Sequence, residues 1–407
     1  MENVKKRYLE AHEDGYLPGF ALMASSQDGD TVIFSGGKQS LNPNSANPFT
    51  ENTICALASM TKLLTAVVVL QCIEHGLLNL DANVNVILPE VGKYDIITGW
   101  DDETNQGIFQ SITTPITLRM LLTHTSGHAY DWFRPALKNW RASRGEQPWL
   151  GATVEQKATI PLVFAPGTQF AYGVGVDWAG KMVERVTGQT LEVFMKERIW
   201  EPLGMRDVTF WPKERGEFEG RMAGMNRLGE NGEGRAEEVP GFDIGGGATD
   251  CLGGGGAFAS TKAYFTFLQA VLRRDEKILK KTSWQELFRP QLSPELKAFF
   301  NEYLHADPLR AQYLAMGIPA SITKTWCFAG MICEDAQEGR FSAGTVFWGG
   351  MPSMAWWIDG AVGTCGLATC QVMPPMCPKI MALHEKFQRA VFGGVGIAKS
   401  TDALQAQ

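Results

Sequence analysis

The chain has 407 residues, 44% of them hydrophobic and 20% charged, and its 37 basic and 44 acidic side chains give a formal net charge of −7. This composition is typical of a folded globular protein and excludes a disordered chain. The charges form no long basic run, so we expect no nucleic-acid partner, and no stretch is apolar enough to cross a membrane. The length predicts roughly two or three domains, or one domain with a large insertion.

The eight cysteines form no C-x-x-C pair, and several of them lie in apolar runs. Residues 1–13 are polar and charged, unlike the apolar core of a secretory signal. We therefore expect reduced, buried cysteines in a cytoplasmic protein.

The N-terminal part predicts one helix, then two strands, then a long apolar helix. The first helix covers residues 2–13, and the strands cover 19–25 and 31–36 with a turn at 27–30 between them. The apolar helix covers residues 59–75. It has no polar face of normal width, so it belongs in the interior of the protein.

The remainder predicts helices first and strands afterwards. Residues 90–320 predict helices joined by polar or glycine-rich connections. Four strands and a last helix follow, at residues 326–332, 344–348, 354–358, 363–372 and 379–391. Because strands lie at both ends with helices between them, we expect an α/β sheet domain made of residues 1–90 and 320–407, with a mainly helical inserted domain at 91–319.

Ser59, Met60, Thr61 and Lys62 form an S-x-x-K tetrad at the start of the apolar helix. Residues three apart share a helix face, so the Lys62 amine can reach the Ser59 hydroxyl. Burial disfavours the charged form of a lysine, which leaves a neutral amine to take the serine proton. The N–H groups at the helix start favour the negative charge that develops during attack. The tetrad predicts a nucleophilic serine with a lysine base.

The spacing alone is weak evidence, because a second S-x-x-K match occurs at residues 321–324. That second match opens no predicted helix. At Ser59 the plainer interpretation is an N-cap serine beside a solvated lysine. Its place before an otherwise lysine-free apolar helix favours the catalytic interpretation, because a buried charge needs a reason.

Two later segments could complete such a site. Tyr172 follows a Pro-Gly turn, and a tyrosine beside a lysine can lose its proton more easily or relay one. Trp348, Gly349 and Gly350 end a predicted strand, where glycine lets a substrate approach the backbone and a free N–H can donate to an oxyanion. Each feature alone is more typical of a core tyrosine or of a simple strand-to-turn pair of glycines.

The order of these motifs is similar to that of one known family. The S-x-x-K tetrad is followed by L-L-T-H-T-S-G at 121–127, the tyrosine, four glycines at 253–256 and a strand ending in W-G-G. This order resembles the β-lactamase-related family of class C β-lactamases, D-Ala-D-Ala peptidases and class VIII esterases, and looks closest to the fungal lovastatin-pathway acyltransferases. The resemblance covers about residues 15–390. It implies a serine-β-lactamase/penicillin-binding-protein-like α/β (α+β) fold, in which helices flank an antiparallel sheet and a helical domain is inserted.

The resemblance also implies a role for each site residue. A donor would acylate Ser59, while Lys62 and Tyr172 would act as the proton-shuttling base. The backbone N–H groups of Ser59 and Met351 would form the oxyanion hole. The substrate-binding residues implied at the acyl or acceptor pocket are Tyr130, Trp348, Gly349 and Gly350.

The chain departs from the β-lactamase pattern at two places. The Y-x-N triplet is Tyr172-Gly173-Val174 here, so the asparagine that would hold a β-lactam amide is missing. The K-T-G triplet is W-G-G at 348–350, so the lysine that would pair with an antibiotic carboxylate is missing too. Both losses favour neutral, bulky esters or thioesters. Pro375 stands where the lovastatin relative has a tryptophan after its last strand, which changes the expected pocket.

We therefore expect a serine acyltransferase of secondary-metabolite biosynthesis, which moves an acyl group from a thioester on a carrier protein or small thiol to a small-molecule alcohol. An ester or amide hydrolase with the same site and a catalytically silent binding protein are the alternatives. A Ser-His-Asp hydrolase using His124 lacks the G-x-S-x-G elbow, and a metal site at His124 and His128 lacks an evident third ligand. We expect no cofactor and no metal.

Overall fold

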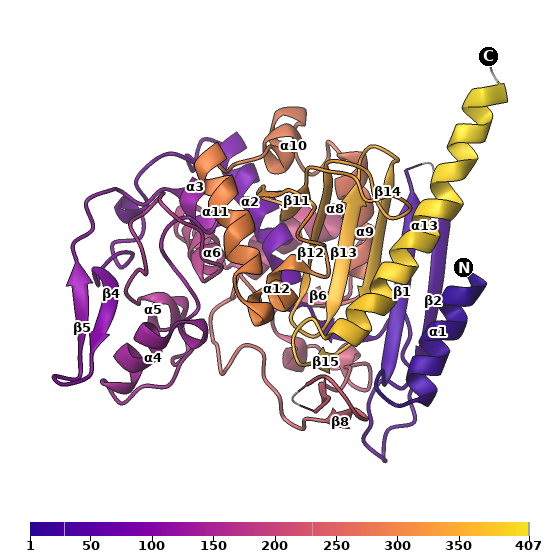
Figure 1. Ribbon diagram of the computed structural model, residues 1–407, viewed down its shortest axis with the longest axis horizontal. Coiled ribbons are helices and arrows are strands. Elements are labelled where there is room, and N and C mark those ends of the chain that lie inside the picture. Colours follow the sequence, from indigo (N-terminus) through magenta and orange to yellow (C-terminus); the bar gives the residue numbers. More distant parts are fainter. Residues whose placement is uncertain (28, 230, 406–407) are drawn as a thin grey trace.

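A seven-stranded sheet forms the centre of the computed structural model, which describes residues 1–27, 29–229 and 231–405 (Figure 1). The strand order is β10-β11-β12-β13-β14-β1-β2, and every neighbouring pair is antiparallel. The strands are β1 (Gly19–Ser26), β2 (Thr31–Gly37), β10 (Lys324–Trp326), β11 (Met331–Cys333), β12 (Thr345–Gly350), β13 (Met354–Asp359) and β14 (Thr364–Thr369). The predicted antiparallel sheet flanked by helices is confirmed.

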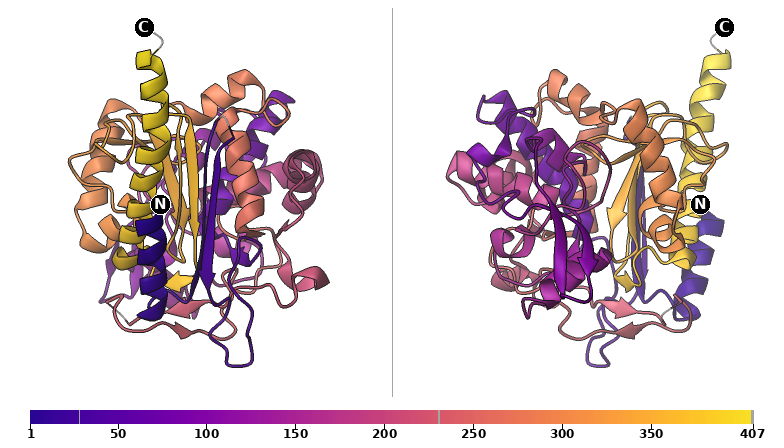
Figure 2. Two further views of the ribbon diagram at one scale, coloured as in Figure 1. Left: turned by 90° about the vertical axis from the view of Figure 1, so that its right-hand side faces the viewer. Right: turned by 60° about the vertical axis from the view of Figure 1, so that its left-hand side comes forward.

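Helices cover both faces of this sheet. α1 (Glu2–Glu13) packs beside α13 (Pro378–Gln405), and Figure 2 shows the two helices together in front of the strands. α9 (Thr261–Arg273) packs on β14 and β1 from the other side (Figure 1). β1, β12, β13 and β14 are buried along their whole length, because both of their faces meet helices or loops.

The apolar helix predicted from the sequence is α2 (Thr61–Glu74), and it lies in the interior. Its residues are buried continuously from Thr61 to Cys72. It packs against α6 (Gly175–Thr187) and α10 (Lys281–Phe288). The helix ends where Gly76 adopts a left-handed φ of 71°, a conformation that stops the α-helical hydrogen-bond ladder.

Shorter elements complete the fold around α2 and the sheet. The remaining helices are α3 (Leu118–Leu122), α4 (Pro135–Ala142), α5 (Val154–Ala158), α7 (Leu191–Met195), α8 (Glu201–Leu203), α11 (Pro294–His305) and α12 (Pro308–Ala315). The other strands form three small sheets. The first contains β3 (Ile54–Ala56), β9 (Phe258–Ser260) and β6 (Val208–Thr209), and the second contains β15 (Val372–Met373), β7 (Asn226–Arg227) and β8 (Glu237–Glu238). The third is the hairpin of β4 (Ile96–Asp101) and β5 (Gln106–Gln110).

Several predicted boundaries are wrong. The strand predicted at 326–332 is the β10–β11 hairpin, because Cys327 N–H donates to the Gly330 carbonyl and turns the chain. The strand predicted at 363–372 divides into β14 and β15. The β4–β5 hairpin lies in the stretch predicted to be helical. The turn predicted at 27–30 includes residue 28, which lies outside the described residues.

All eight cysteines are free and buried, as predicted. Among the described residues, no helix has the length and apolar character needed to cross a membrane. The division into a sheet domain and an inserted domain stays a prediction, although the strands of the large sheet do come from both ends of the chain.

Candidate active site

Ser59 lies on a short turn between strand β3 and helix α2. A 3₁₀ turn (Ala58–Met60) connects β3 to α2, and Leu57 N–H donates to the Ala257 carbonyl at 2.9 Å. Ala58 has a φ of 48°, a left-handed conformation that costs energy for a residue with a Cβ and persists only where the surroundings impose it. The α-helix begins at Thr61, two residues later than predicted, and Ser59 stands at the edge of a cavity.

Lys62 is the buried cation at this turn, with 6% of its surface exposed. Its Nζ donates to Ser59 Oγ at 3.2 Å, to the Tyr130 hydroxyl at 3.2 Å and to the Gly254 carbonyl at 2.6 Å. An ammonium has three N–H donors, so these acceptors satisfy all of them. The structure thus brings together the two ends of the S-x-x-K tetrad. The second match at 321–324 lies in a turn that leads into β10, without a helix, as predicted.

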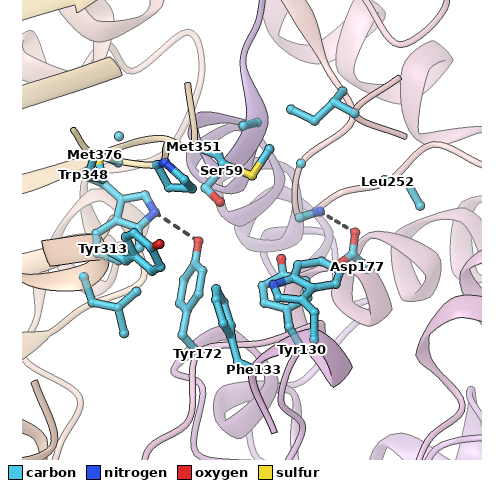
Figure 3. Close-up of a pocket in the computed structure, with 18 of the residues that line it drawn as sticks. Ser59, Tyr130, Phe133, Tyr172, Asp177, Leu252, Tyr313, Trp348, Met351 and Met376 are labelled. Carbon is cyan, nitrogen blue, oxygen red and sulfur yellow. Dashed lines mark hydrogen bonds between the residues drawn. The ribbon is translucent and has the colours of Figure 1, made fainter. Parts of the chain in front are cut away.

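Tyr172 lies against Lys62 with its ring rather than with its hydroxyl. Lys62 Nζ is 4.7 Å from the ring centroid, and the hydroxyl accepts a hydrogen bond from Trp348 Nε1 at 3.3 Å (Figure 3). Among the described hydrogen bonds, none joins Tyr172 to Ser59 or Lys62. The side chain points into the same cavity as Ser59, so a substrate placed between them would reach both hydroxyls.

Tyr130 comes closer to Lys62 than the sequence predicted for a pocket residue. Its hydroxyl accepts from Lys62, and its ring stacks on Trp132 with centroids 4.4 Å apart. Burial raises the pKa of Tyr130 well above its ordinary value, and the negative charge of Asp177 acts in the same direction. Tyr130 is therefore a neutral phenol that anchors the lysine.

His124 fixes the segment that carries Tyr172. Its Nδ1 accepts a hydrogen bond from the Gly173 N–H at 3.4 Å, and its carbonyl accepts from the Ala171 N–H at 2.9 Å. Burial lowers the pKa of His124 well below its ordinary value, and the charge of Lys62 acts in the same direction. The imidazole is neutral, and His124 holds the loop that leads to Tyr172.

Ser59 and Met351 both line the cavity with their backbones in position to meet a substrate (Figure 3). In the described part of the chain, neither N–H donates to a protein acceptor. A pair of unpaired N–H groups beside a nucleophile is the arrangement that binds a developing oxyanion. The geometry therefore supports the oxyanion hole implied by the resemblance.

The two glycines that end β12 serve different purposes. Gly349 lines the cavity, as does Trp348. Gly350 does not, because the space in front of its Cα is filled by the Leu57 carbonyl, 2.5 Å from where a Cβ would stand. Gly350 lets β12 pack directly onto the turn that presents Ser59.

The cavity has a volume of about 140 Å³ and is walled mainly by aromatic and aliphatic side chains. Among the described residues that line it, Asp177 is the one that carries a charge. A substrate carboxylate would find no cation there, in agreement with the missing lysine of K-T-G. The remaining walls include Trp132, Phe133, Trp149, Ile244, Leu252, Tyr313, Leu314, Pro375 and Met376.

Sequence reasoning missed two members of the site. Gly254 supplies the shortest hydrogen bond of Lys62, and Asp177 accepts from the Gly254 N–H at 2.8 Å. The glycine-rich run at 253–256 counted in the sequence only as part of the motif order and had no assigned role. An aspartate within the apolar start of α6 was the available signal, since a buried charge needs a partner.

Comparison with known proteins agrees with the fold and the motifs. The sequence matches the Beta-lactamase family over residues 6–386. The ML-236A carboxylate methylbutanoyltransferase of Penicillium citrinum is 34% identical over 93% of this chain and 91% of its own. The lovastatin esterase of Penicillium rubens is 33% identical over 95% of this chain and 96% of its own. A solved simvastatin synthase mutant from Aspergillus terreus covers 97% of both chains at 31% identity, with a TM-score of 0.89.

A match that spans nearly the whole chain, in sequence and in structure, places the protein in one family. The relatives with these names are acyltransferases and an esterase, so enzymatic activity is the family property that this chain shares. The chain belongs to the β-lactamase family and is a serine acyltransferase or esterase-type enzyme of that family.

Proposed function

We propose that this enzyme transfers an acyl group from a thioester donor, through an acyl-Ser59 intermediate, to the hydroxyl of a small-molecule acceptor in secondary-metabolite biosynthesis. The observation that carries the proposal is the 3.2 Å hydrogen bond from Lys62 Nζ to Ser59 Oγ at the edge of an apolar cavity. Relatives named as methylbutanoyltransferases, one of them 34% identical, support transfer.

In the first half-reaction, the neutral amine of Lys62 takes the proton of Ser59 as Oγ attacks the thioester carbonyl. The carbonyl oxygen becomes an oxyanion, and the N–H groups of Ser59 and Met351 donate to it. The C–S bond then breaks, the thiolate takes a proton from the Lys62 ammonium, and the acyl group stays on Oγ as an ester.

In the second half-reaction, an acceptor hydroxyl attacks the acyl-Ser59 carbonyl. We assign to Tyr172 and Lys62 the acceptance of its proton and the return of a proton to Ser59 Oγ, since Tyr172 lines the cavity and Lys62 Nζ lies 4.7 Å from its ring. The new ester leaves, and the free serine is restored.

The side chains that line the cavity favour neutral, apolar substrates. Charged groups would lose their hydration in a cavity made mostly of aromatic side chains, and the described walls offer no cation to replace it. A carrier protein or a small thiol is the proposed bearer of the thioester. A cytoplasmic location, expected from the free cysteines, stays a prediction.

Ester hydrolysis is the second candidate function. The lovastatin esterase of Penicillium rubens is 33% identical to this chain over nearly its full length, which supports hydrolysis as the alternative outcome. The chemistry of Ser59 is the same in both, and the outcome depends on whether water or an alcohol reaches the acyl-enzyme.

The test is to incubate the protein with an acyl thioester and a panel of hydrophobic alcohols, and to quantify ester and free acid by mass spectrometry. Transfer predicts that ester forms in preference to acid when the alcohol is present. Acid as the sole product with every alcohol would assign the enzyme to hydrolysis.

A further inference from the structure

Asp177 and Lys62 are connected through a single residue. Asp177 Oδ1 accepts a hydrogen bond from the Gly254 N–H at 2.8 Å, and the carbonyl of Gly254 accepts from Lys62 Nζ at 2.6 Å (Figure 3 shows the first of these). Asp177 is 1% exposed and lies in the first turn of α6. The carboxylate therefore fixes the peptide that in turn holds the amine.

The second oxygen of Asp177 is buried and has no hydrogen-bond partner among the described residues. Burial raises the pKa of Asp177, while the charge of Lys62 and the hydrogen bond from Gly254 act to lower it. A half-satisfied buried carboxylate is costly, so it calls for a compensating partner. Lys62 is the nearby cation that reaches the same peptide.

Lys157 is the other cation whose charge acts on Asp177. Its Nζ donates to the Trp149 carbonyl at 2.9 Å and to the Gly246 carbonyl at 2.9 Å. Those bonds direct it to two loops rather than to the carboxylate. Lys62 is therefore the cation linked to Asp177 by hydrogen bonds.

The link also explains why residue 254 is glycine. A Cβ at this position would overlap the carboxylate of Asp177, including its unpaired oxygen. Any larger residue would push the carboxylate away from the peptide or move the peptide away from Lys62. The carboxylate of Asp177 can therefore lie this close to the peptide only because residue 254 is glycine.

We propose that Asp177 is a positioning residue for the lysine base: it holds the Gly254 peptide so that the carbonyl keeps the Lys62 amine against Ser59, and its negative charge stabilises the ammonium that forms during attack. This inference rests on the proposed function, because it assigns a part in the Ser59 reaction. Asp177 lines the cavity, but the part assigned to it acts through the Gly254 peptide and the Lys62 amine rather than through the reacting atoms.

Other titratable groups also surround the amine, and they come from different segments of the chain. The groups that face Lys62 are Ser59, His124, Tyr130, Tyr172 and Asp177. Burial keeps His124 neutral and Tyr130 protonated, as described above. Asp177 is accordingly the group whose negative charge acts on the amine.

The sign of the pH effect follows from this charge. Removing an anion beside Lys62 favours the neutral amine, so the base stays active to lower pH. The same change removes stabilisation from the ammonium that forms in the transition state, so the maximal rate falls. A residue that only supported the fold would not move the pH profile in this way.

The experiment compares Asp177→Asn with the wild type in the acylation of Ser59 by a short-chain p-nitrophenyl ester, from about pH 5 to about pH 10. Asparagine keeps an oxygen for the Gly254 N–H and loses the charge. We expect the acid limb of kcat/KM to move to lower pH by about one unit, and kcat to fall about tenfold with KM nearly unchanged.

Asp359→Asn is the matched control, because Asp359 is also 1% exposed and accepts hydrogen bonds from the backbone N–H groups of Ser342 and Ala361. Its pH profile should superimpose on that of the wild type. If folded Asp177→Asn kept both the acid limb of kcat/KM and the kcat of the wild type, the inference would be overturned.

Gly254→Ala covers the case in which Asp177→Asn does not fold. Its Cβ displaces the carboxylate from the peptide while the charge remains. We expect kcat to fall about tenfold with KM preserved, and an unchanged kcat would contradict the inference. Ser59→Ala in the same assay separates the two proposals, because turnover retained there would refute the covalent mechanism itself.

Discussion

At the residue scale, the position of the Lys62 amine determines which group can take the Ser59 proton. Lys62 Nζ is held by Ser59, Tyr130 and Gly254, and it is 6% exposed. The bonds to Tyr130 and Gly254 fix its direction, so in the neutral amine the lone pair faces Ser59 Oγ before a substrate binds. This is preorganisation by hydrogen bonds rather than by a salt bridge.

Lys62→Ala should lower kcat by about 10²-fold or more, because it removes the group that takes the Ser59 proton. Steady-state hydrolysis of an activated ester measures the loss, and circular dichroism checks the fold. Ser321→Ala is the control, since it alters the S-x-x-K match that opens no helix. Equal losses in the two variants would count against the assignment of the tetrad.

Gly350→Ala should destabilise the protein by about 1–3 kcal/mol and impair acylation, because its Cβ would stand 2.5 Å from the Leu57 carbonyl beside the Ser59 turn. Urea denaturation measures the free energy of unfolding. Gly360→Ala is the matched control, with no heavy atom within 4 Å of its Cβ. If both alanines were tolerated equally, the close contact at β12 would not matter for the site.

Motif spacing foretold Ser59 and Lys62 because residues three apart on a helix must share a face. Asp177 and Gly254 could not be foretold in the same way. Their hydrogen bond joins residues 77 apart, and such a pairing depends on how α6 and the glycine run pack. Tyr130 was placed in the pocket, but its bond to Lys62 also depends on packing.

At the scale of elements, α10 and the segment around α3 are joined by a charged cluster. Arg119 donates to Asp81, Glu286 and Gln291. Arg289 donates to Glu286 as well. Burial acts to raise the pKa of Glu286, but hydrogen bonds from Arg289, Arg119 and Gln291 outweigh it and lower the pKa to about 2.

This lowered pKa predicts how stability depends on pH. A carboxyl with a depressed folded-state pKa contributes stability above its ordinary value of 4.5, and that stability is lost as the pH falls toward about 2. The wild type should lose about 2 kcal/mol more than Glu286→Gln over this window. Chemical denaturation at several pH values measures the difference, and parallel curves for the two proteins would refute it.

Element types were easier to foretell than their ends. The all-round apolar pattern identified α2, because such a pattern follows from burial, and the turn signal at 27–30 separated the two strands that are β1 and β2. The β4–β5 hairpin was missed because its residues are mostly exposed and leave no alternation to detect. The β10–β11 hairpin was missed because both strands and their turn are buried.

At the scale of the whole molecule, the first and last helices are connected to the loop beside the site. The Tyr8 hydroxyl on α1 bonds to His384 Nδ1 on α13 at 2.7 Å, and His384 Nε2 donates to the Ser353 carbonyl at 2.7 Å. Ser353 N–H in turn donates to the Met351 carbonyl. The terminal helices therefore brace the loop that presents the Met351 N–H.

Tyr8→Phe should reduce the free energy of unfolding by about 1 kcal/mol or more, because it leaves His384 Nδ1 buried without a donor. Tyr16→Phe removes the same atom from a tyrosine that makes no side-chain hydrogen bond in the described part of the chain, and it should cost less. Urea denaturation compares the two. A larger loss in Tyr16→Phe would contradict this account of the terminal helices.

The general architecture followed from strands at both ends of the sequence, together with the family resemblance. The β-lactamase family match over residues 6–386 confirms it. The pairing of β14 with β1 joins segments more than three hundred residues apart, and no local pattern specifies that register.

The central claim is that Ser59 carries the acyl group, and intact-protein mass spectrometry tests it most directly. Wild type and Ser59→Ala would be incubated with the same acyl thioester, quenched in acid, weighed and digested. We predict an added mass equal to the acyl group on the peptide that contains Ser59, and none in Ser59→Ala. An adduct on another residue, or full turnover by Ser59→Ala, would contradict the account.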